Sequence, residues 1–186
     1  MRGAPHRGRR GARELTTTPL AEIAKRSRVQ REWALKLVAD LNDEQLAWRP
    51  TPTAHSIGWT LWHVARGDDN FQRDLTGRSI WKDGGYGARW GHPDRMNKME
   101  DSAAAAMPLP AKDDLLGYVR AVFAATDAAV ATIDEARFGE EIESGFMSGR
   151  VAVGASLIAQ VGHDARHLGE MEYIKGLIGL PGTVTA

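Results

Sequence analysis

The sequence contains no cysteine, and this absence removes several kinds of site at once. A chain without cysteine forms no disulfide, holds no metal through thiolate sulfur and has no cysteine nucleophile. Any bound metal ion must therefore be held by histidine, aspartate, glutamate or backbone oxygen. A reaction that needs sulfur must obtain it from a substrate, because the protein cannot supply a thiol of its own.

The sequence also lacks a long apolar run and an excess of charge of one sign. No stretch reaches the roughly 18 consecutive apolar residues of a membrane span, and no apolar signal segment stands near the start. Lys+Arg and Asp+Glu are equal at 24 each, so no overall field attracts nucleic acid or membrane. We therefore expect a cytoplasmic protein that acts on a small-molecule substrate, with no nucleic-acid or membrane partner.

Positive charge is nevertheless concentrated at the start of the chain. Residues 1–13 contain five arginines and no acidic residue, which leaves the remainder mildly acidic. This segment has almost nothing apolar to bury, so we expect residues 1–17 to form a disordered basic tail. Residues 18–182 are then expected to form a single domain with a sizeable core.

Four long segments have the apolar spacing of amphipathic helices, and no segment alternates in the manner of a strand. The first helix follows Thr18, an N-cap with proline next to it, and the second follows Ser56, another good N-cap. The expected helices cover residues 19–41, 57–75, 113–133 and 151–178. Four helices without strands predict an all-α fold, a four-helix bundle.

Residues 77–110 form the connection between the second and third helices, which is long for a compact domain. The connection is rich in glycine and aromatic residues. Trp81, Tyr86 and Trp90 favour a segment that packs on the bundle over one that is disordered.

The last expected helix carries two histidines, His163 and His167, four residues apart. Residues at this spacing lie on one helix face, and two imidazoles so placed can reach one metal ion. Both fall within the apolar stripe of that helix, together with Glu170, so they should point into the protein. A buried imidazole needs a polar partner, and a shared cation is one way to provide it.

Two histidines alone hold a cation weakly, and a catalytic site of this kind usually has a third protein ligand. The His-Glu-x-x-His pattern of zinc peptidases is a poor match, because Asp164 stands where those enzymes place their glutamate. The third ligand must then come from upstream, where His55, His63 and His92 are candidates. A position inside the second helix favours His63 modestly over His55, and His92 lies in the long connection.

Two segments of the chain carry a family resemblance. Residues 55–71, HSIGWTLWHVARGDDNF, resemble the second helix of the DinB/YfiT-like superfamily, and residues 163–182, HDARHLGEMEYIKGLIGLPG, resemble its last helix. The resemblance covers roughly residues 20–182. It implies a four-helix bundle in which three histidines hold one divalent metal. Carried over by position, these ligands are His63, His163 and His167.

The resemblance also implies a kind of activity. Members of the superfamily include thiol S-transferases and an isomerase that use low-molecular-weight thiols such as mycothiol or bacillithiol. We therefore expect a metal-dependent enzyme that transfers such a thiol to a small electrophile, and ligation by nitrogen alone favours Zn or Ni. A metal-dependent hydrolase and a non-catalytic metal-binding or structural bundle are the alternatives, and a homodimer is compatible with each.

Glu170 is the candidate catalytic residue beside these ligands. The family pattern often has Gln at the position that Glu170 occupies here. Its carboxylate could act as a base, or it could accept a hydrogen bond from one of the metal-binding imidazoles. The sequence leaves both roles open.

Overall fold

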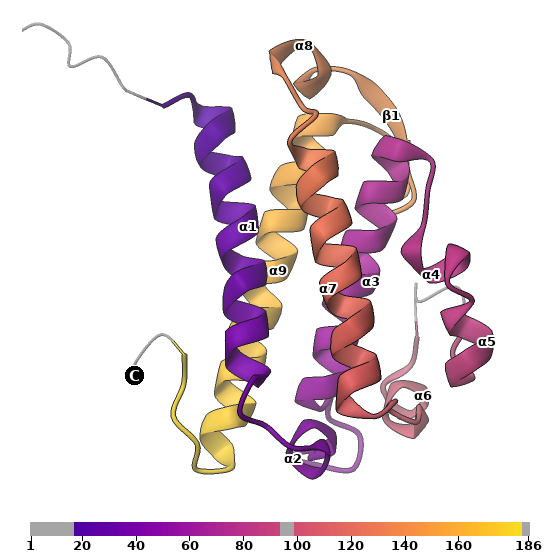
Figure 1. Ribbon diagram of the computed structural model, residues 1–186, viewed down its shortest axis with the longest axis vertical. Coiled ribbons are helices and arrows are strands. Elements are labelled where there is room, and N and C mark those ends of the chain that lie inside the picture. Colours follow the sequence, from indigo (N-terminus) through magenta and orange to yellow (C-terminus); the bar gives the residue numbers. More distant parts are fainter. Residues whose placement is uncertain (1–16, 94–98, 184–186) are drawn as a thin grey trace, which may run out of the picture.

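The computed structural model describes residues 17–93 and 99–183. Within these ranges, four long helices run side by side along the longest axis of the molecule (Figure 1). They are α1 (Pro19–Val38), α3 (Ile57–Thr76), α7 (Lys112–Val130) and α9 (Val153–Leu177). Both α1 and α3 pack against α7 and α9. The expected all-α four-helix bundle is confirmed, whereas the expected basic tail lies outside the described residues except for Thr17.

Helices α1 and α3 begin at the capping residues that the sequence indicates, Thr18 and Ser56. The hydroxyl of Thr18 accepts a hydrogen bond from the backbone N–H of Ala21 at 3.2 Å. The hydroxyl of Ser56 accepts one from the backbone N–H of Trp59, also at 3.2 Å. Each bond satisfies a backbone donor that has no partner within its helix, so each fixes where the helix starts.

The first helix ends earlier than its apolar pattern indicates, at Val38 instead of about Leu41. Asn42 forms a reciprocal capping box with Gln45 and so begins a separate short helix, α2 (Asp43–Ala47). Leu41 remains buried between the two helices. Its burial made the apolar pattern continue past the true end of the helix.

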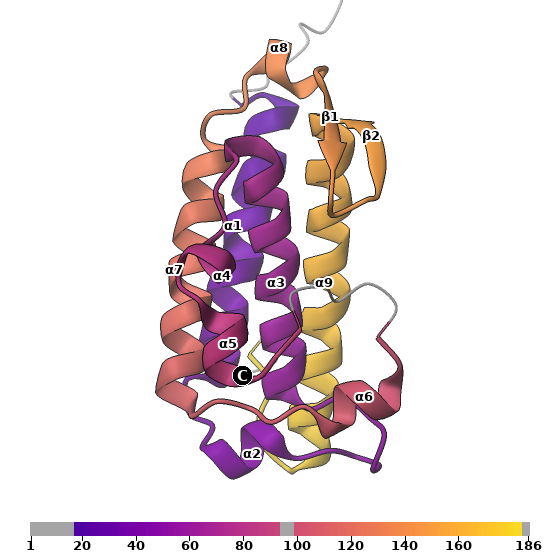
Figure 2. The ribbon, with the colours of Figure 1, turned by 90° about the vertical axis from the view of Figure 1, so that its right-hand side faces the viewer.

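Helices α3 and α7 run in the same direction, so the chain between them must return along the bundle (Figures 1 and 2). This return explains the length of the connection. It contains three short helices in its described part: α4 (Ile80–Asp83), α5 (Tyr86–Trp90) and α6 (Asp101–Ala106). The carboxylate of Asp69 on α3 anchors α4, because it accepts hydrogen bonds from the Ser79 hydroxyl at 2.6 Å and the Ile80 N–H at 2.7 Å.

The aromatic residues of the connection pack on the bundle, as the sequence indicates. Trp81 is 1% exposed, and its ring contacts those of Trp62 on α3 and Tyr118 on α7. The guanidinium of Arg66 lies 4.2 Å from the centre of the Trp81 ring, a favourable cation–π arrangement. Trp81 is therefore part of the core, and Tyr86 and Trp90 pack against it.

A β-hairpin stands where the sequence predicts a loop and the first residues of the last helix, so that helix begins at Val153 instead of residue 151. After the short helix α8 (Glu135–Phe138), β1 (Glu141–Ser144) pairs antiparallel with β2 (Gly149–Ala152). The strands are short and largely exposed, so their sequence shows no apolar alternation. The carboxylate of Asp74 on α3 holds the turn by accepting the Gly145 N–H at 2.8 Å.

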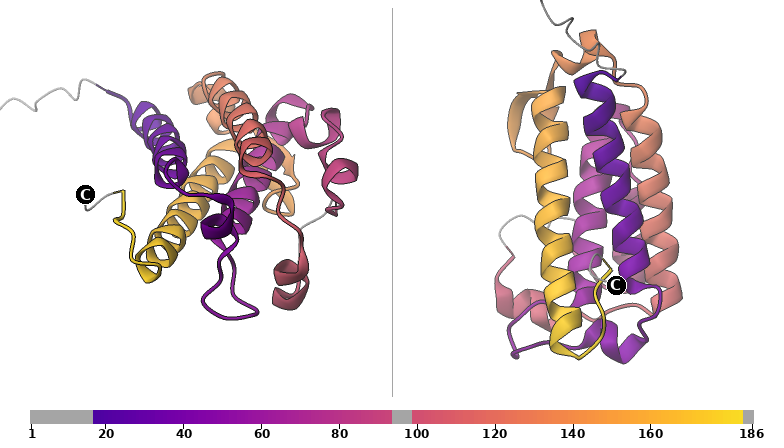
Figure 3. Two further views of the ribbon diagram at one scale, coloured as in Figure 1. Left: turned by 60° about the horizontal axis from the view of Figure 1, so that its bottom comes forward. Right: turned by 90° about the vertical axis from the view of Figure 1, so that its left-hand side faces the viewer.

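Helix α9 follows the hairpin directly and buries most of its apolar stripe. Val153, Met171 and Ile174 are buried, whereas Leu177 in the last turn is 48% exposed. After α9 the chain turns back beside α1 and α9 (Figure 3). None of the helices in the described part of the chain is both long enough and apolar enough to cross a membrane.

Candidate metal centre

His63 on α3 meets His163 and His167 on α9 in the interior of the bundle. A ring nitrogen of each residue lies within 4.8 Å of a ring nitrogen of the other two. The Nε2 atoms of His63 and His163 are 3.1 Å apart. Two nitrogens that each bind one tetrahedral ion at 2.0–2.1 Å are about 3.3 Å apart, so the observed separation suits a shared cation. We call these three residues the histidine cluster.

A glycine on α3 makes room for the cluster. Gly67 lies one helical turn after His63 and faces His163 on the neighbouring helix. A Cβ atom at Gly67 would be 3.0 Å from Cε1 and 3.4 Å from Nδ1 of His163. Any larger side chain would therefore push the His163 ring, so this close approach of α3 and α9 depends on glycine.

The surroundings keep two of the clustered imidazoles, those of His63 and His163, neutral. Burial, followed by the neighbouring His163 and His167, lowers the pKa of His63 to about 3. Burial is also the main reason that the pKa of His163 is lowered to about 4. A histidine must be neutral to donate a lone pair to a metal, so these two residues are ready to bind one at neutral pH.

Glu170 orients the third imidazole. Its Oε2 atom is 2.8 Å from Nδ1 of His167, and its Oε1 atom is 3.2 Å from Nδ1 of His55. The hydrogen bond from His167 is the main cause that lowers the pKa of Glu170, so the carboxylate is ionised and can only accept. Nδ1 of His167 then carries the proton, which leaves the Nε2 lone pair free for a cation.

This geometry bears on the two roles considered for Glu170. Both of its carboxylate oxygens accept hydrogen bonds from imidazoles, which supports the partner role over the role of a base. The carboxylate–histidine pair is the usual second layer around a protein metal site. The catalytic role of Glu170 stays a prediction.

The contact between Arg166 and His167 would have to break when a cation binds to the histidine cluster. Nη2 of Arg166 lies 3.4 Å from Nε2 of His167, the nitrogen that Glu170 leaves free. Arg166 is exposed, so its side chain can swing into solvent at little cost. The donor set, the separation of the nitrogens and the neutral state of His63 and His163 together fit a divalent ion that accepts imidazole ligands.

The other upstream histidines lie outside the cluster. Nε2 of His92 is 2.6 Å from the carbonyl oxygen of Pro108, and its ring packs edge-on against Trp62. His55 stacks on Trp59 at 3.9 Å, and Trp59 stacks in turn on His63 at 5.0 Å. The contact between His55 and Glu170 was not anticipated, because helical periodicity does not fix the direction of a side chain that precedes the helix.

The residue between the two α9 histidines faces a different neighbour. Asp164 is 3% exposed and lies 3.9 Å from Arg31 on α1, which also pairs with Asp68 at 3.3 Å and with Asp127. Burial raises the pKa of Asp164 to about 7, against the opposing effect of Arg31, and burial also raises the pKa of Asp68. We call Arg31, Asp68, Asp127 and Asp164 the arginine cluster.

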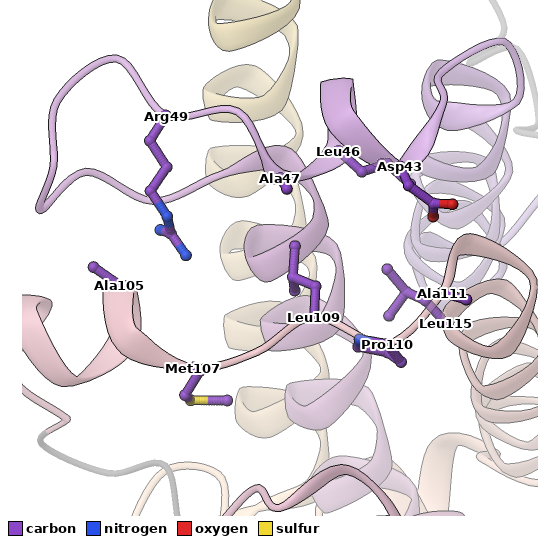
Figure 4. Close-up of a pocket in the computed structure, with 10 residues that line it drawn as sticks. All are labelled: Asp43, Leu46, Ala47, Arg49, Ala105, Met107, Leu109, Pro110, Ala111 and Leu115. Atoms are coloured by element: carbon purple, nitrogen blue, oxygen red, sulfur yellow. The ribbon is translucent and has the colours of Figure 1, made fainter.

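A hollow of about 360 Å³ lies at the end of the bundle, between α2 and the segment that joins α6 to α7 (Figure 4). Leu46, Met107 and Leu109 form much of its wall, and Arg49 points into it. None of the residues that line the hollow belongs to the histidine cluster. The hollow and the candidate metal centre are therefore separate features.

The fold and the cluster define a four-helix bundle with a three-histidine site suited to a divalent metal. A family model described as the DinB superfamily matches residues 3–171, a range that contains all three histidines. The chain belongs to the DinB superfamily.

Two solved structures are similar to the chain. A conserved protein from Enterococcus faecalis has a TM-score of 0.74 and 19% identity, over 88% of this chain and 99% of that chain. A DinB-like protein from Bacillus cereus has a TM-score of 0.60 and 16% identity, over 86% of this chain and 93% of that chain. At these identities the likeness shows the fold alone. No curated protein matches the chain.

Proposed function

We propose that the protein is a divalent-metal-dependent enzyme that transfers a low-molecular-weight thiol, of the mycothiol or bacillithiol type, to a small electrophile. The observation that carries the proposal is the convergence of three imidazoles inside a DinB-superfamily bundle. Zn and Ni are the metals that this all-nitrogen set suits best. A bound ion would supply positive charge that favours the ionised form of a thiol or a water molecule at its open position.

The protein's own side chains would position the reacting groups. Glu170 holds His167 through the Nδ1 hydrogen bond, and Trp59 stacks on the ring of His63. The rings are thus fixed before a substrate arrives, which lowers the cost of organising the site.

The proposed reaction takes its sulfur from the first substrate, because the chain contains no cysteine. That sulfur forms a bond to an electrophilic carbon of the second substrate. The group displaced from this carbon leaves with the bonding electron pair, and the proton of the thiol passes to solvent.

Two assays on one Zn-loaded or Ni-loaded preparation test the proposal. The first follows the consumption of a small thiol with a panel of electrophiles, and the second follows the hydrolysis of esters and amides without thiol. We expect turnover in the first assay, and its loss in His63→Ala and His167→Ala. His92→Gln is the matched control, since it changes a buried histidine outside the cluster and keeps a donor near Pro108.

Each other outcome selects a different function. Turnover only in the second assay would replace the transferase with a metal-dependent hydrolase. Metal binding without turnover in either assay would favour a non-catalytic metal-binding bundle. Failure of the wild-type protein to bind metal would favour a structural role for the histidines.

A further inference from the structure

Glu170 lies between two imidazoles, and only one of them belongs to the histidine cluster. The second is His55, whose Nδ1 atom is 3.2 Å from Oε1 of Glu170. An ionised carboxylate accepts hydrogen bonds and donates none, so Nδ1 of His55 must carry the hydrogen in this contact. His55 and His167 therefore each contact one of the two carboxylate oxygens of Glu170.

We infer that His55 is a positioning residue of the metal centre: it donates to Glu170 and thereby holds the carboxylate in the place where it orients His167. This inference rests on the proposed metal site. His55 would act on the bound ion only through Glu170 and His167, so it is neither a ligand nor a catalytic residue.

The position of His55 suits this task, because its backbone is fixed by the neighbouring helix cap and its ring contacts Trp59 and Asp101. The next residue, Ser56, is the N-cap of α3 and fixes the backbone through its bond to the Trp59 N–H. The His55 ring stacks on the indole of Trp59, with ring centres 3.9 Å apart and planes inclined by 26°. Nε2 of His55 lies 3.7 Å from the carboxylate of Asp101 on α6.

The arrangement links the protein surface to a metal ligand through side chains from separate parts of the chain. Asp101 belongs to α6, His55 precedes α3, and Glu170 and His167 belong to α9. The side chains of Asp101, His55 and Glu170 are 78%, 25% and 31% exposed, so solvent reaches the outer part of the link. Water would compete for Glu170 if His55 were absent, and the carboxylate would lose its fixed orientation.

Two substitutions separate hydrogen-bond donation from ring stacking. His55→Asn places an amide N–H near the position of Nδ1 and removes the ring. His55→Phe keeps a ring that can stack on Trp59 and removes the donor. Loss of a hydrogen-bond partner behind a metal ligand typically weakens metal affinity about 10–100-fold. His55 acts one residue further out, through Glu170, so we expect His55→Phe to bind Zn²⁺ about tenfold more weakly than the wild type, at the lower end of this range, and His55→Asn to stay within about threefold of it.

The measurements are competition with a chromophoric chelator for Zn²⁺ affinity, and ¹⁵N NMR of the imidazoles in the metal-free protein. The NMR spectra report which nitrogen of His167 carries the proton. We expect the Nδ1–H form to dominate in the wild type and in His55→Asn, and to lose population in His55→Phe. Urea unfolding of all three proteins shows whether a change in affinity reflects a change in folding.

The inference is overturned if His55→Phe equals the wild type in both measurements, or if His55→Asn falls as far as His55→Phe. A wild-type protein that binds no Zn²⁺ would count against the proposed function. In that case the NMR spectra of the metal-free proteins would still show whether His55 positions Glu170. Failure of the proposed function and failure of this inference are therefore distinguishable.

Discussion

The interior of the bundle contains two polar clusters that touch, and they solve the problem of burial in different ways. His163 and Asp164 are consecutive on α9, yet His163 joins the histidine cluster and Asp164 joins the arginine cluster. In the arginine cluster, the guanidinium of Arg31 offsets the charge of buried carboxylates within the protein. In the histidine cluster, three imidazoles bring ring nitrogens together, and burial keeps those of His63 and His163 neutral.

This difference distinguishes buried polar groups that stabilise the fold from buried polar groups that bind something from solution. A buried ion pair that supplies its own counter-charge needs nothing from solution, so it serves the fold. A set of neutral donors with converging lone pairs is completed by a cation from outside. The two clusters should therefore respond oppositely to substitution: changes in the arginine cluster should alter stability, and changes in the histidine cluster should alter metal binding.

The largest effect is expected from Arg31→Met in the arginine cluster. The substitution keeps most of the side-chain bulk but removes the guanidinium that pairs with Asp68 and Asp164, so these buried carboxyl groups must stay charged without a partner or take up protons. Breaking one partner out of a buried ion pair typically costs about 3–5 kcal/mol. Urea unfolding at neutral pH should show a loss of this size in the free energy of unfolding.

Arg28→Met is the matched control, because Arg28 lies on the same helix and pairs with Glu32 at an exposed position. Exposed ion pairs contribute about 0–1 kcal/mol, so this variant should nearly equal the wild type. Equal losses in the two variants would contradict the structural role of the arginine cluster.

His163→Ala should give the converse result. We expect metal affinity to fall at least about a hundredfold, since loss of a direct ligand should exceed the 10–100-fold effect of losing a residue behind one. The free energy of unfolding of the metal-free protein should change much less, because the long helices retain their apolar core. Elemental analysis and chelator competition measure the metal, and urea unfolding measures the fold. The opposite result, a large loss in the free energy of unfolding with unchanged metal affinity, would mean that His163 serves the fold and not metal binding.

Lowering the pH should affect the free energy of unfolding in opposite directions through His63 in one cluster and Asp164 in the other. An unfolded histidine binds a proton near pH 6.5, whereas folded His63 does so only near pH 3, so acidification favours the unfolded state. Each such histidine lowers the free energy of unfolding by up to about 1.4 kcal/mol per pH unit, or by about 2 kcal/mol between pH 6.5 and pH 5. Asp164 acts in the opposite sense, because its folded pKa of about 7 lies above the unfolded value and the folded state gains the proton first.

Metal-free His63→Leu and Asp164→Asn variants test these signs. Urea unfolding at pH 7.5 and pH 5 should show that His63→Leu loses less stability on acidification than the wild type. Asp164→Asn should lose more, since it lacks the carboxyl whose protonation favours the folded state. Identical pH dependence in all three proteins would mean that neither cluster is buried as described.

The smallest effect is expected from Gly67→Ala, at the contact between α3 and α9. Its Cβ atom would lie 3.0 Å from Cε1 of His163 and displace that ring by a few tenths of an ångström. We expect metal affinity to fall by about tenfold, in the lower part of the range for disturbed ligand positioning. Chelator competition measures the change.

Gly117→Ala on α7 is the control, because a Cβ at Gly117 has open space around it. Replacing glycine by alanine in a helix interior gains about 1 kcal/mol from helix propensity. Gly117→Ala should show this gain without any change in metal affinity. Unchanged metal affinity in Gly67→Ala would show that the His163 ring can shift without loss of ligation.

The sequence by itself determined the four long helices, the starting points of the first two and two of the three cluster residues. Local physics fixes these features: Thr18 and Ser56 satisfy free backbone donors, and a spacing of four residues places His163 and His167 on one face. The helical pattern alone leaves His55, His63 and His92 as candidates for the third ligand, and the family resemblance selects His63. The hairpin at 141–152 was missed because its strands carry no apolar alternation.

Only the tertiary structure decided which polar groups meet. The pairing of Arg31 with Asp164 and the contact between His55 and Glu170 join residues more than a hundred positions apart. Such contacts depend on how the helices pack and rotate against one another, and no periodicity along a single helix encodes that. The separation of neighbouring His163 and Asp164 into two clusters has the same cause: on a helix, adjacent residues point about 100° apart, and the packing of α1 and α3 decides what each one finds.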